Sequence, residues 1–198
     1  MSSYNQPLSL NAALPILAKG PVTIAAGCTD LFAMTQARAL SGDVLDITRI
    51  PELRGITTAS DHIRIGATTT WRDILRADIP RSFDMLKQAG KEVGSVQIQS
   101  SATVAGNICN ASPAADGVPC LLALDAVVEL VSGAGTRTMP LSQFLLRSRK
   151  TAMVAGELMT AIIVPTSACS GQSQFMKLGA RAHLVISIAM VAARIDIQ

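Results

Sequence analysis

Two stretches of small and polar residues have the composition of ligand-binding loops. The first, Ala25–Leu31, reads Ala-Ala-Gly-Cys-Thr-Asp-Leu and lies between an expected strand and an expected helix. Small residues let a backbone approach a ligand closely, and the amides that begin a helix attract an anion such as a pyrophosphate. The stretch has neither the glycine spacing of a dinucleotide-binding motif nor the lysine of a P-loop. Its spacing alone therefore leaves an ordinary turn after a strand as the alternative.

The second stretch, Ser101–Asp116, gathers hydroxyl, amide and small side chains and ends in a single carboxylate. The apolar run Val118–Leu124 follows it. So many hydrogen-bonding groups beside a core are typical of a loop that lines a polar cofactor. An ordinary turn region of Ser and Asn residues is the alternative that the residues alone leave open.

Composition restricts the possible functions of the chain. With 198 residues, 49% hydrophobic and 16% charged, it is long and apolar enough to bury a substantial core. Aromatic residues make up 3% and the net charge is only +3, which argues against a nucleic-acid partner. The basic cluster Arg147–Lys150 is expected to be a solvated loop edge.

The cysteines and the apolar runs bear on metal binding and location. Four cysteines without C-x-x-C spacing and two histidines give no convincing zinc or iron–sulfur ligand set. A reduced, cytoplasmic protein is the expectation. The longest apolar run, within Leu184–Ala193, is too short to span a bilayer and is expected to form a buried strand.

The first part of the sequence predicts a small parallel βαβ layer. A helix over Leu8–Leu17, capped by Ser9 or Asn11, precedes a strand over Val22–Ala26. Asp30 is expected to cap a helix over Leu31–Leu40. A buried strand over Val44–Ile47 completes the layer.

From Gly55 onward the pattern changes to a larger α+β region with mostly antiparallel strands. Helices are expected over Trp71–Ala77, capped by Thr70, and over Arg81–Lys91, whereas Gly94–Ser112 favours neither helix nor strand. The expected strands are Ile56–Thr58, Ile63–Ile65, Ala126–Val131, Arg137–Met139, Leu158–Val164, Phe175–Leu178 and Val185–Ile197.

The two loops resemble the flavin-binding signatures of one enzyme family. Ala26–Leu31 is similar to Ala-Gly-Gly-Thr-Asp-Leu, and Thr103–Asn107 with Ala111–Asp116 is similar to Thr-Ile/Val-Gly-Gly-Asn followed by Ala-Ser-Pro-x-x-Asp. Both belong to the FAD subunit of molybdenum hydroxylases, a group that includes xanthine dehydrogenases and aerobic carbon monoxide dehydrogenases. Further similar stretches extend the resemblance over nearly the whole chain: Leu45–Leu53, Ile65–Thr70, Val93–Ile98, Leu122–Ala126, Gly156–Leu158 and Phe175–Gly179.

The resemblance implies an α+β chain with the two-lobed FAD-binding fold of vanillyl-alcohol-oxidase-type enzymes. The small βαβ lobe would span residues 1–54, and the larger mixed or antiparallel lobe residues 55–170. Residues 171–198 would begin a C-terminal domain that is truncated here. FAD would lie, noncovalently bound, between the lobes. The implied cofactor-binding residues are Ala25, Ala26, Gly27, Cys28, Thr29, Asp30, Leu31, Thr103, Val104, Ala105, Gly106, Asn107, Asp116 and Lys177.

The resemblance also implies a role for the main members of this set. Gly27–Thr29 would face the pyrophosphate, and Leu31 would pack near the flavin ring. Within Thr103–Asn107, the Thr, the Gly and the Asn would contact the diphosphate and ribityl region. Asp116 would accept hydrogen bonds from cofactor hydroxyls. Lys177 would lie near the flavin, where its charge stabilises the anionic reduced form.

Two positions depart from the family signatures. Cys28 and Ala105 stand where the family often has glycine. A Cβ costs about 1 kcal/mol where the backbone needs a positive φ, and is tolerated where the site needs only space. Binding of FAD at this site is therefore expected to persist, at reduced strength if φ is positive.

The implied function is electron transfer by FAD, with no catalytic acid or base and no metal on this chain. Electrons would come from [2Fe–2S] clusters on a small subunit, after hydroxylation of the substrate at a molybdenum–pterin centre on a large subunit. NAD⁺, a quinone or oxygen would accept them. The alternatives are a self-contained flavin oxidoreductase of the same fold and a truncated assembly module without FAD.

Overall fold

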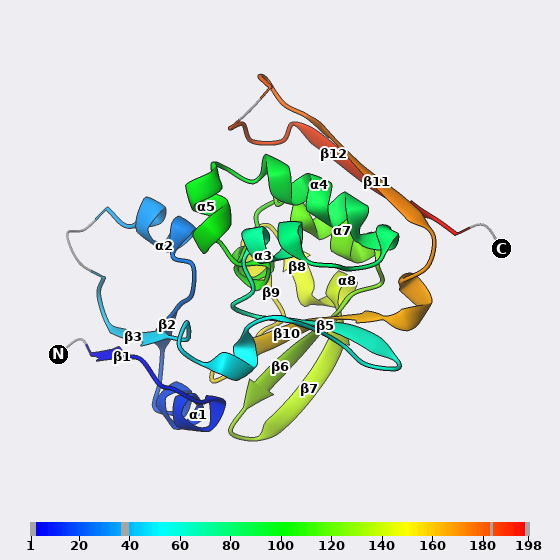
Figure 1. Cartoon of the computed structure of the whole chain (residues 1–198). Coiled ribbons are helices and arrows are strands. Elements are labelled where there is room, and N and C mark those ends of the chain that lie inside the picture. Colours follow the sequence, from blue (N-terminus) through cyan, green and yellow to red (C-terminus); the bar gives the residue numbers. More distant parts are fainter. Residues whose placement is uncertain (1–2, 37–39, 183, 197–198) are drawn as a thin grey trace.

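The small N-terminal lobe contains a parallel three-stranded sheet. The computed structural model describes residues 3–36, 40–182 and 184–196. In the small sheet β3 (Asp43–Asp46) lies between β1 (Tyr4–Asn5) and β2 (Val22–Ala25), and both pairings are parallel. Helices α1 (Leu10–Ala18) and α2 (Thr29–Met34) complete the lobe. This arrangement confirms the expected βαβ layer (Figure 1).

The expected cap is confirmed for α1 but not for α2. Ser9, not Asn11, caps α1, because its hydroxyl accepts a hydrogen bond from the amide of Ala12 at 3.2 Å. Asp30 is not the cap of α2; it lies in the first turn, and Cys28 precedes the helix.

The expected extent of α2 to Leu40 is also wrong, because the helix ends at Met34. The Thr35 hydroxyl donates to the carbonyl of Leu31, which would accept from the Thr35 amide if the helix continued. The backbone of Thr35 is extended instead. Residues 37–39 of the expected helix lie outside the described part of the chain.

The larger lobe is built on an antiparallel sheet of five strands. In spatial order these are β4 (Ile56–Thr58), β5 (His62–Gly66), β10 (Leu158–Pro165), β6 (Val127–Ser132) and β7 (Gly135–Pro140). The central strand β10 is almost continuously buried, and its Ile162 pairs with Ile65 on one side and Val128 on the other. The two expected hairpins, β4–β5 and β6–β7, are confirmed.

A layer of helices lies between this sheet and a two-stranded ribbon. Figure 1 shows α4 and α7 between the sheet and the ribbon of β11 and β12, which pair antiparallel. The helices are α3 (Trp71–Arg76), α4 (Asp84–Glu92), α5 (Val96–Ser101), α6 (Val104–Asn110), α7 (Gly117–Ala123) and α8 (Leu141–Phe144). The remaining elements are β8 (Leu145–Arg147), β9 (Lys150–Thr151), β11 (Gln172–Leu178), β12 (Ala189–Ile195), and the 3-10 turns η1 (Pro51–Leu53), η2 (Arg81–Phe83) and η3 (Thr166–Ala168).

The polar segment Gly94–Ser112 forms two helices, α5 and α6, which the sequence analysis did not predict. Its hydroxyl residues are caps rather than loop residues. The side chains of Ser95 and Thr103 accept hydrogen bonds from the amides of Ile98 and Gly106, respectively. Because the apolar side chains of α6 are buried in the main core, tertiary packing stabilises a helix of modest propensity.

The last expected strand, Val185–Ile197, begins later than expected and is not buried as expected, and Ile197 lies outside the described residues. It begins at Ala189 rather than Val185, and its side chains alternate between exposed and partly buried positions. Met190 and Ala192 pack against the main core, whereas Val191 and Ile195 are 64% exposed. The apolar run therefore forms one strand of a ribbon that packs on the core with one face and leaves the other face exposed.

Each lobe has its own hydrophobic core. The small core contains Ala13, Leu17, Leu45, Ile47, Ile50 and Leu53, and it also takes in Leu158 from the first position of β10. The large core lies between the five-stranded sheet and the helices. Leu158 therefore joins the two lobes by packing. The domain boundaries after residues 54 and 170 stay predictions. Among the described residues, no helix has the length and apolar character needed to cross a membrane.

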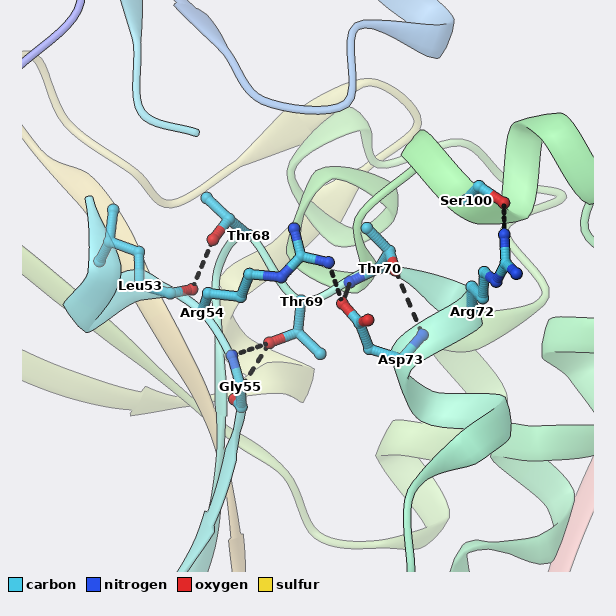
Figure 2. Close-up of polar contacts among 9 residues, drawn as sticks. All are labelled: Leu53, Arg54, Gly55, Thr68, Thr69, Thr70, Arg72, Asp73 and Ser100. Carbon is cyan, nitrogen blue, oxygen red and sulfur yellow. Dashed lines mark hydrogen bonds and ion pairs between the residues drawn. The ribbon is translucent and has the colours of Figure 1, made fainter. Parts of the chain in front are cut away.

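Two threonine side chains fix the segment that joins the lobes (Figure 2). The Thr68 hydroxyl donates to the carbonyl of Leu53 at 2.9 Å. The Thr69 hydroxyl donates to the carbonyl of Gly55 and accepts from its amide, both at 3.0 Å. Both threonines are buried, so these contacts replace water for polar backbone groups at the lobe junction.

The third threonine of this run, Thr70, caps α3 as the sequence predicted. Its hydroxyl accepts from the amide of Asp73, and the Asp73 carboxylate accepts from the amide of Thr70 at 2.9 Å, which is a capping box. Arg54 from the lobe junction donates to the same carboxylate at 2.8 Å (Figure 2). The start of α3 is thereby attached to the junction.

Candidate cofactor site

A cavity of about 760 Å³ lies where the start of α2, the helix α6 and the start of β10 meet. This volume is within the roughly 300–1,000 Å³ usual for ligand sites. The structure brings both expected loops to this one cavity, although they are far apart in the sequence. The expected site residues that line it are Ala26, Gly27, Cys28, Thr29, Asp30, Leu31, Thr103, Ala105, Gly106, Asn107, Asp116 and Lys177.

Two expected site residues do not line the cavity. Ala25 is the last residue of β2, is 6% exposed, and its carbonyl accepts from the amide of Ile47. Val104 is fully buried in the main core at the start of α6. Ala25 was included because it adjoins the first signature, and Val104 because it is part of the second, but neighbours on a strand or helix point in different directions.

Gly27 brings the two lobes into close contact. A Cβ at this position would lie 2.1 Å from the carbonyl oxygen of Ser101, at the end of α5. Only glycine therefore lets the turn after β2 approach the larger lobe. Gly27 of the first signature is therefore required for packing between the lobes, in addition to any contact with a ligand.

The two departures from the family signatures have different backbone conformations. Cys28 has a φ of 57° and a ψ of 9°, in the left-handed region that favours glycine. Ala105 lies inside α6 and is not among the described residues with positive φ. The Cβ of Cys28 therefore carries conformational strain, whereas the Cβ of Ala105 is compatible with its helix.

Thr103 and Gly106 form a compact turn at the start of α6. The Thr103 hydroxyl accepts from the amide of Gly106 at 3.0 Å, and a Cβ on Gly106 would lie 2.7 Å from that hydroxyl oxygen. As an acceptor in this contact, the hydroxyl keeps its own hydrogen available for donation. A ligand oxygen in the cavity is a suitable acceptor for it.

Asp116 and Lys177 form a buried ion pair on the cavity wall. The Lys177 ammonium lies 2.8 Å from the Asp116 carboxylate, and the two side chains are 8% and 6% exposed. The second carboxylate oxygen accepts from the hydroxyl of Ser187. In this structure the Asp116 carboxylate is thus engaged by the protein, which is a narrower role than the expected contact with cofactor hydroxyls.

Arg149 is a cavity residue that the sequence analysis missed, because its basic cluster was interpreted as a solvated loop edge. It lies in the turn between β8 and β9 with a φ of 57°, and it lines the cavity. Its guanidinium donates to the side chain of Asn110, whose amide donates to Asp30 at 2.8 Å. This chain of contacts connects α6 of the larger lobe with α2 of the small lobe.

Glu157, another missed residue, lies at the edge of the cavity just before β10. Arg137 donates to its two carboxylate oxygens at 2.5 and 2.9 Å, and the amide of Val154 donates to one of them. The hydrogen bond from Arg137 is the main reason that the pKa of Glu157 lies below its ordinary value. The Gly-Glu-Leu segment that resembled the family was the sequence signal for this position.

The cysteines do not have the surroundings of a nucleophile. All four are free thiols. Burial raises the pKa of Cys109 and of Cys120 to about 12, and burial beside Asp46 raises that of Cys28. A thiol activated for catalysis has a lowered pKa instead.

The residues of the cavity fit FAD. Asn107 lines the cavity, and its side-chain nitrogen makes no hydrogen bond within the described residues and is not buried, so it can donate to a cofactor oxygen. Of the two cations on the cavity wall, Lys177 is paired with Asp116, whereas Arg149 has no ion-pair partner in the described part of the chain. A dianionic diphosphate needs such a charge.

Comparison with known proteins agrees with this geometry. Residues 1–167 match the family described as the FAD binding domain in molybdopterin dehydrogenase. The chain belongs to this family. Its α+β fold, a small parallel sheet followed by a larger antiparallel sheet, is that of the FAD-binding domain in carbon monoxide dehydrogenase.

Individual members of the molybdopterin dehydrogenase family cover most of this chain. It is 38% identical over 85% of its length to the nicotinate dehydrogenase FAD-subunit of Eubacterium barkeri, and 33% identical over 83% to the xanthine dehydrogenase FAD-binding subunit of Escherichia coli. It covers 58% of each of those proteins. A chain of the reconstituted CO dehydrogenase from Oligotropha carboxidovorans superimposes with a TM-score of 0.89 at 26% identity, over 97% of this chain and 68% of that one.

Proposed function

We propose that this chain binds FAD noncovalently and transfers electrons within a molybdenum hydroxylase complex. The observation that carries the proposal is the convergence of two separate family signatures on one cavity between the lobes. The backbone of Gly27–Thr29 and the turn of Thr103–Gly106 would hold the diphosphate. Lys177 would lie at the flavin end of the site, and Arg149 would supply positive charge.

The chemistry of this function belongs to the cofactor rather than to acid or base side chains. Bound FAD accepts electrons singly and releases them in pairs, which suits a junction between [2Fe–2S] clusters and a two-electron acceptor. The chain's own residues would bind the cofactor, orient it between the lobes and set the charge around it. NAD⁺, a quinone or oxygen is the proposed acceptor.

The proposed partners are a [2Fe–2S] small subunit and a molybdenum–pterin large subunit in the cytoplasm. Support comes from the relatives, two of which are named as FAD subunits of nicotinate and xanthine dehydrogenases. The four free thiols are consistent with a reducing compartment. In this proposal the hydroxylated substrate binds the large subunit, not this chain.

Flavin content is the first test. The purified chain should bind FAD in a one-to-one ratio, and acid or heat denaturation should release the flavin into the supernatant. Flavin that stays on the precipitated protein would contradict noncovalent binding. A chain that binds no flavin would favour an assembly module.

Reduction of the flavin by the organic substrate separates the remaining alternatives. Under anaerobic conditions the absorbance of oxidised flavin should fall only when the large and small subunits are both present. A fall with this chain alone would favour a self-contained flavin oxidoreductase. Stopped-flow reoxidation with NAD⁺, a quinone or oxygen then identifies the acceptor.

A further inference from the structure

The side chain of Trp71 ends in a buried donor without a partner. It is fully buried at the start of α3, and it lines the cavity together with Asn107. Among the described residues, three buried side-chain atoms have no hydrogen-bond partner: Nε1 of Trp71, Oδ1 of Asn107 and Oγ of Ser82. A donor left in this state destabilises the protein, so a partner is expected in the working protein.

Two glycines border the indole ring of Trp71. A Cβ on Gly117 would be 2.8 and 3.2 Å from Cη2 and Cζ2 of Trp71, and 3.0 Å from Oδ1 of Asn107. The Cζ2–Cη2 edge of the indole ring and the amide oxygen of Asn107 therefore border the same point. A Cβ on Gly90 would lie 3.1 Å from Cε3, on another edge of the ring. The two glycines therefore border different parts of the ring, and Gly117 is the position at which the ring and the Asn107 oxygen come together.

The two unpartnered atoms are chemically complementary, because the indole nitrogen only donates and the amide oxygen only accepts. Neither is accessible to solvent. A group in the cavity could reach them only by displacing them, whereas both side chains already border the position of Gly117. The side-chain nitrogen of Asn107, Nδ2, differs from these two buried atoms. It makes no hydrogen bond within the described residues and is not buried, so it faces the open cavity.

We propose that Trp71 is a positioning residue that donates its indole N–H to Oδ1 of Asn107 and so presents the Asn107 amide nitrogen to the cofactor. This inference rests on the proposed function. It also specifies the cofactor group, because an NH₂ donor recognises an acceptor such as a diphosphate oxygen and does not recognise a donor. Rotation of the amide would instead place an oxygen against the phosphate charge.

The hydrogen bond itself can be tested without cofactor. Trp71 is the only tryptophan of the chain, so the ¹⁵N-labelled protein gives a single indole N–H signal. Replacing Asn107→Ala should shift this signal and speed its exchange with water. Ser82→Ala, which removes the unpartnered atom outside the cavity lining, should leave it unchanged. An indole signal with equal exchange in the native protein and in Asn107→Ala overturns the proposal.

The consequence for binding is tested by removing the N–H while keeping the ring shape. Incorporating β-(3-benzothienyl)alanine at position 71 replaces N–H by sulfur and keeps the size of the fully buried ring. This replacement should raise the FAD dissociation constant about tenfold in the native background and have no further effect in Asn107→Ala. An equal loss in both backgrounds, or no loss in either, overturns the positioning role. Native protein that binds no FAD would instead contradict the proposed function, and the cofactor-free measurement would still decide the hydrogen bond.

Discussion

The Lys177 ammonium and the Asp116 carboxylate meet at 2.8 Å across 61 positions of sequence, each more than nine-tenths buried. Lys177 comes from β11 and Asp116 immediately precedes α7, so the pair attaches the ribbon to the helical layer. Because both side chains are buried, the attraction between the two charges offsets part of their desolvation cost. The pair is therefore structural and also places two opposite charges on the cavity wall.

Removing one member of the pair should destabilise the protein more than removing both. Lys177→Met leaves a buried carboxylate without its partner and should lower the free energy of unfolding by ~3–5 kcal/mol. The double variant Lys177→Met with Asp116→Asn has no uncompensated charge and should recover most of that loss. Urea unfolding at neutral pH measures both quantities. Additive losses in the double variant would show that the two side chains act independently.

The same pair should set the reduction potential of bound flavin. A positive charge near the flavin stabilises its anionic reduced form, so Lys177→Met should lower the midpoint potential. Asp116→Asn leaves Lys177 uncompensated and should raise it. Photoreduction with a reference dye gives the potentials. Shifts of the same sign in both variants would place the pair away from the flavin.

Arg149 should contribute to cofactor affinity through its charge. It lines the cavity from the β8–β9 turn, whereas Arg147 lies in the same basic cluster and is not part of the cavity wall. Arg149→Ala should weaken FAD binding about tenfold, since a charged hydrogen bond to phosphate contributes ~1.5–3 kcal/mol before solvent screening. Arg147→Ala should not change affinity. Titration of flavin fluorescence at low and high salt measures both, and equal effects of the two variants would point to nonspecific attraction.

Restoring the signature glycine at Cys28 and at Ala105 should change the stability of the protein in opposite directions. Cys28→Gly relieves a left-handed residue of its Cβ and should stabilise the protein by about 1 kcal/mol. Ala105→Gly places glycine inside α6 and should destabilise it by about 1 kcal/mol. Thermal unfolding of the cofactor-free chain tests the pair. A gain in stability from both substitutions would mean that α6 does not hold Ala105 in a helical conformation.

These two positions show what the sequence could and could not predict. Cys28 and Ala105 look equivalent as replacements of signature glycines, and only the backbone conformation separates them. Local patterns did predict the small βαβ layer, the hairpins of the large sheet and the Thr70 cap, because each depends on residues close in sequence. The family resemblance supplied the two loops of the cavity.

Features formed by distant residues were not predictable in this way. Hydroxyl residues in Gly94–Ser112 favoured a loop locally, but burial of the apolar face of α6 made them helix caps. Arg149 belongs to an ordinary basic cluster in the sequence, and only the fold brings it to the cavity beside Asn110. Val104 shows the reverse, since its place in a signature did not decide which way its side chain points.

The contact between Glu157 and Arg137 should make stability depend on pH in the acid range. Arg137 lowers the pKa of the Glu157 carboxyl in the folded protein below its value of about 4.3 in an unfolded chain. A lowered folded pKa adds stability that is complete above the unfolded pKa and is lost as the pH falls through the folded pKa. Glu157→Gln should therefore be less stable than the native protein at pH 7, and the difference should shrink as the pH falls from about 5 toward 3. Urea midpoints across this range give the difference directly, with the exposed Glu52→Gln as the control. A gap between native protein and Glu157→Gln that is the same at both ends of the range would show that the carboxylate charge does not stabilise the start of β10.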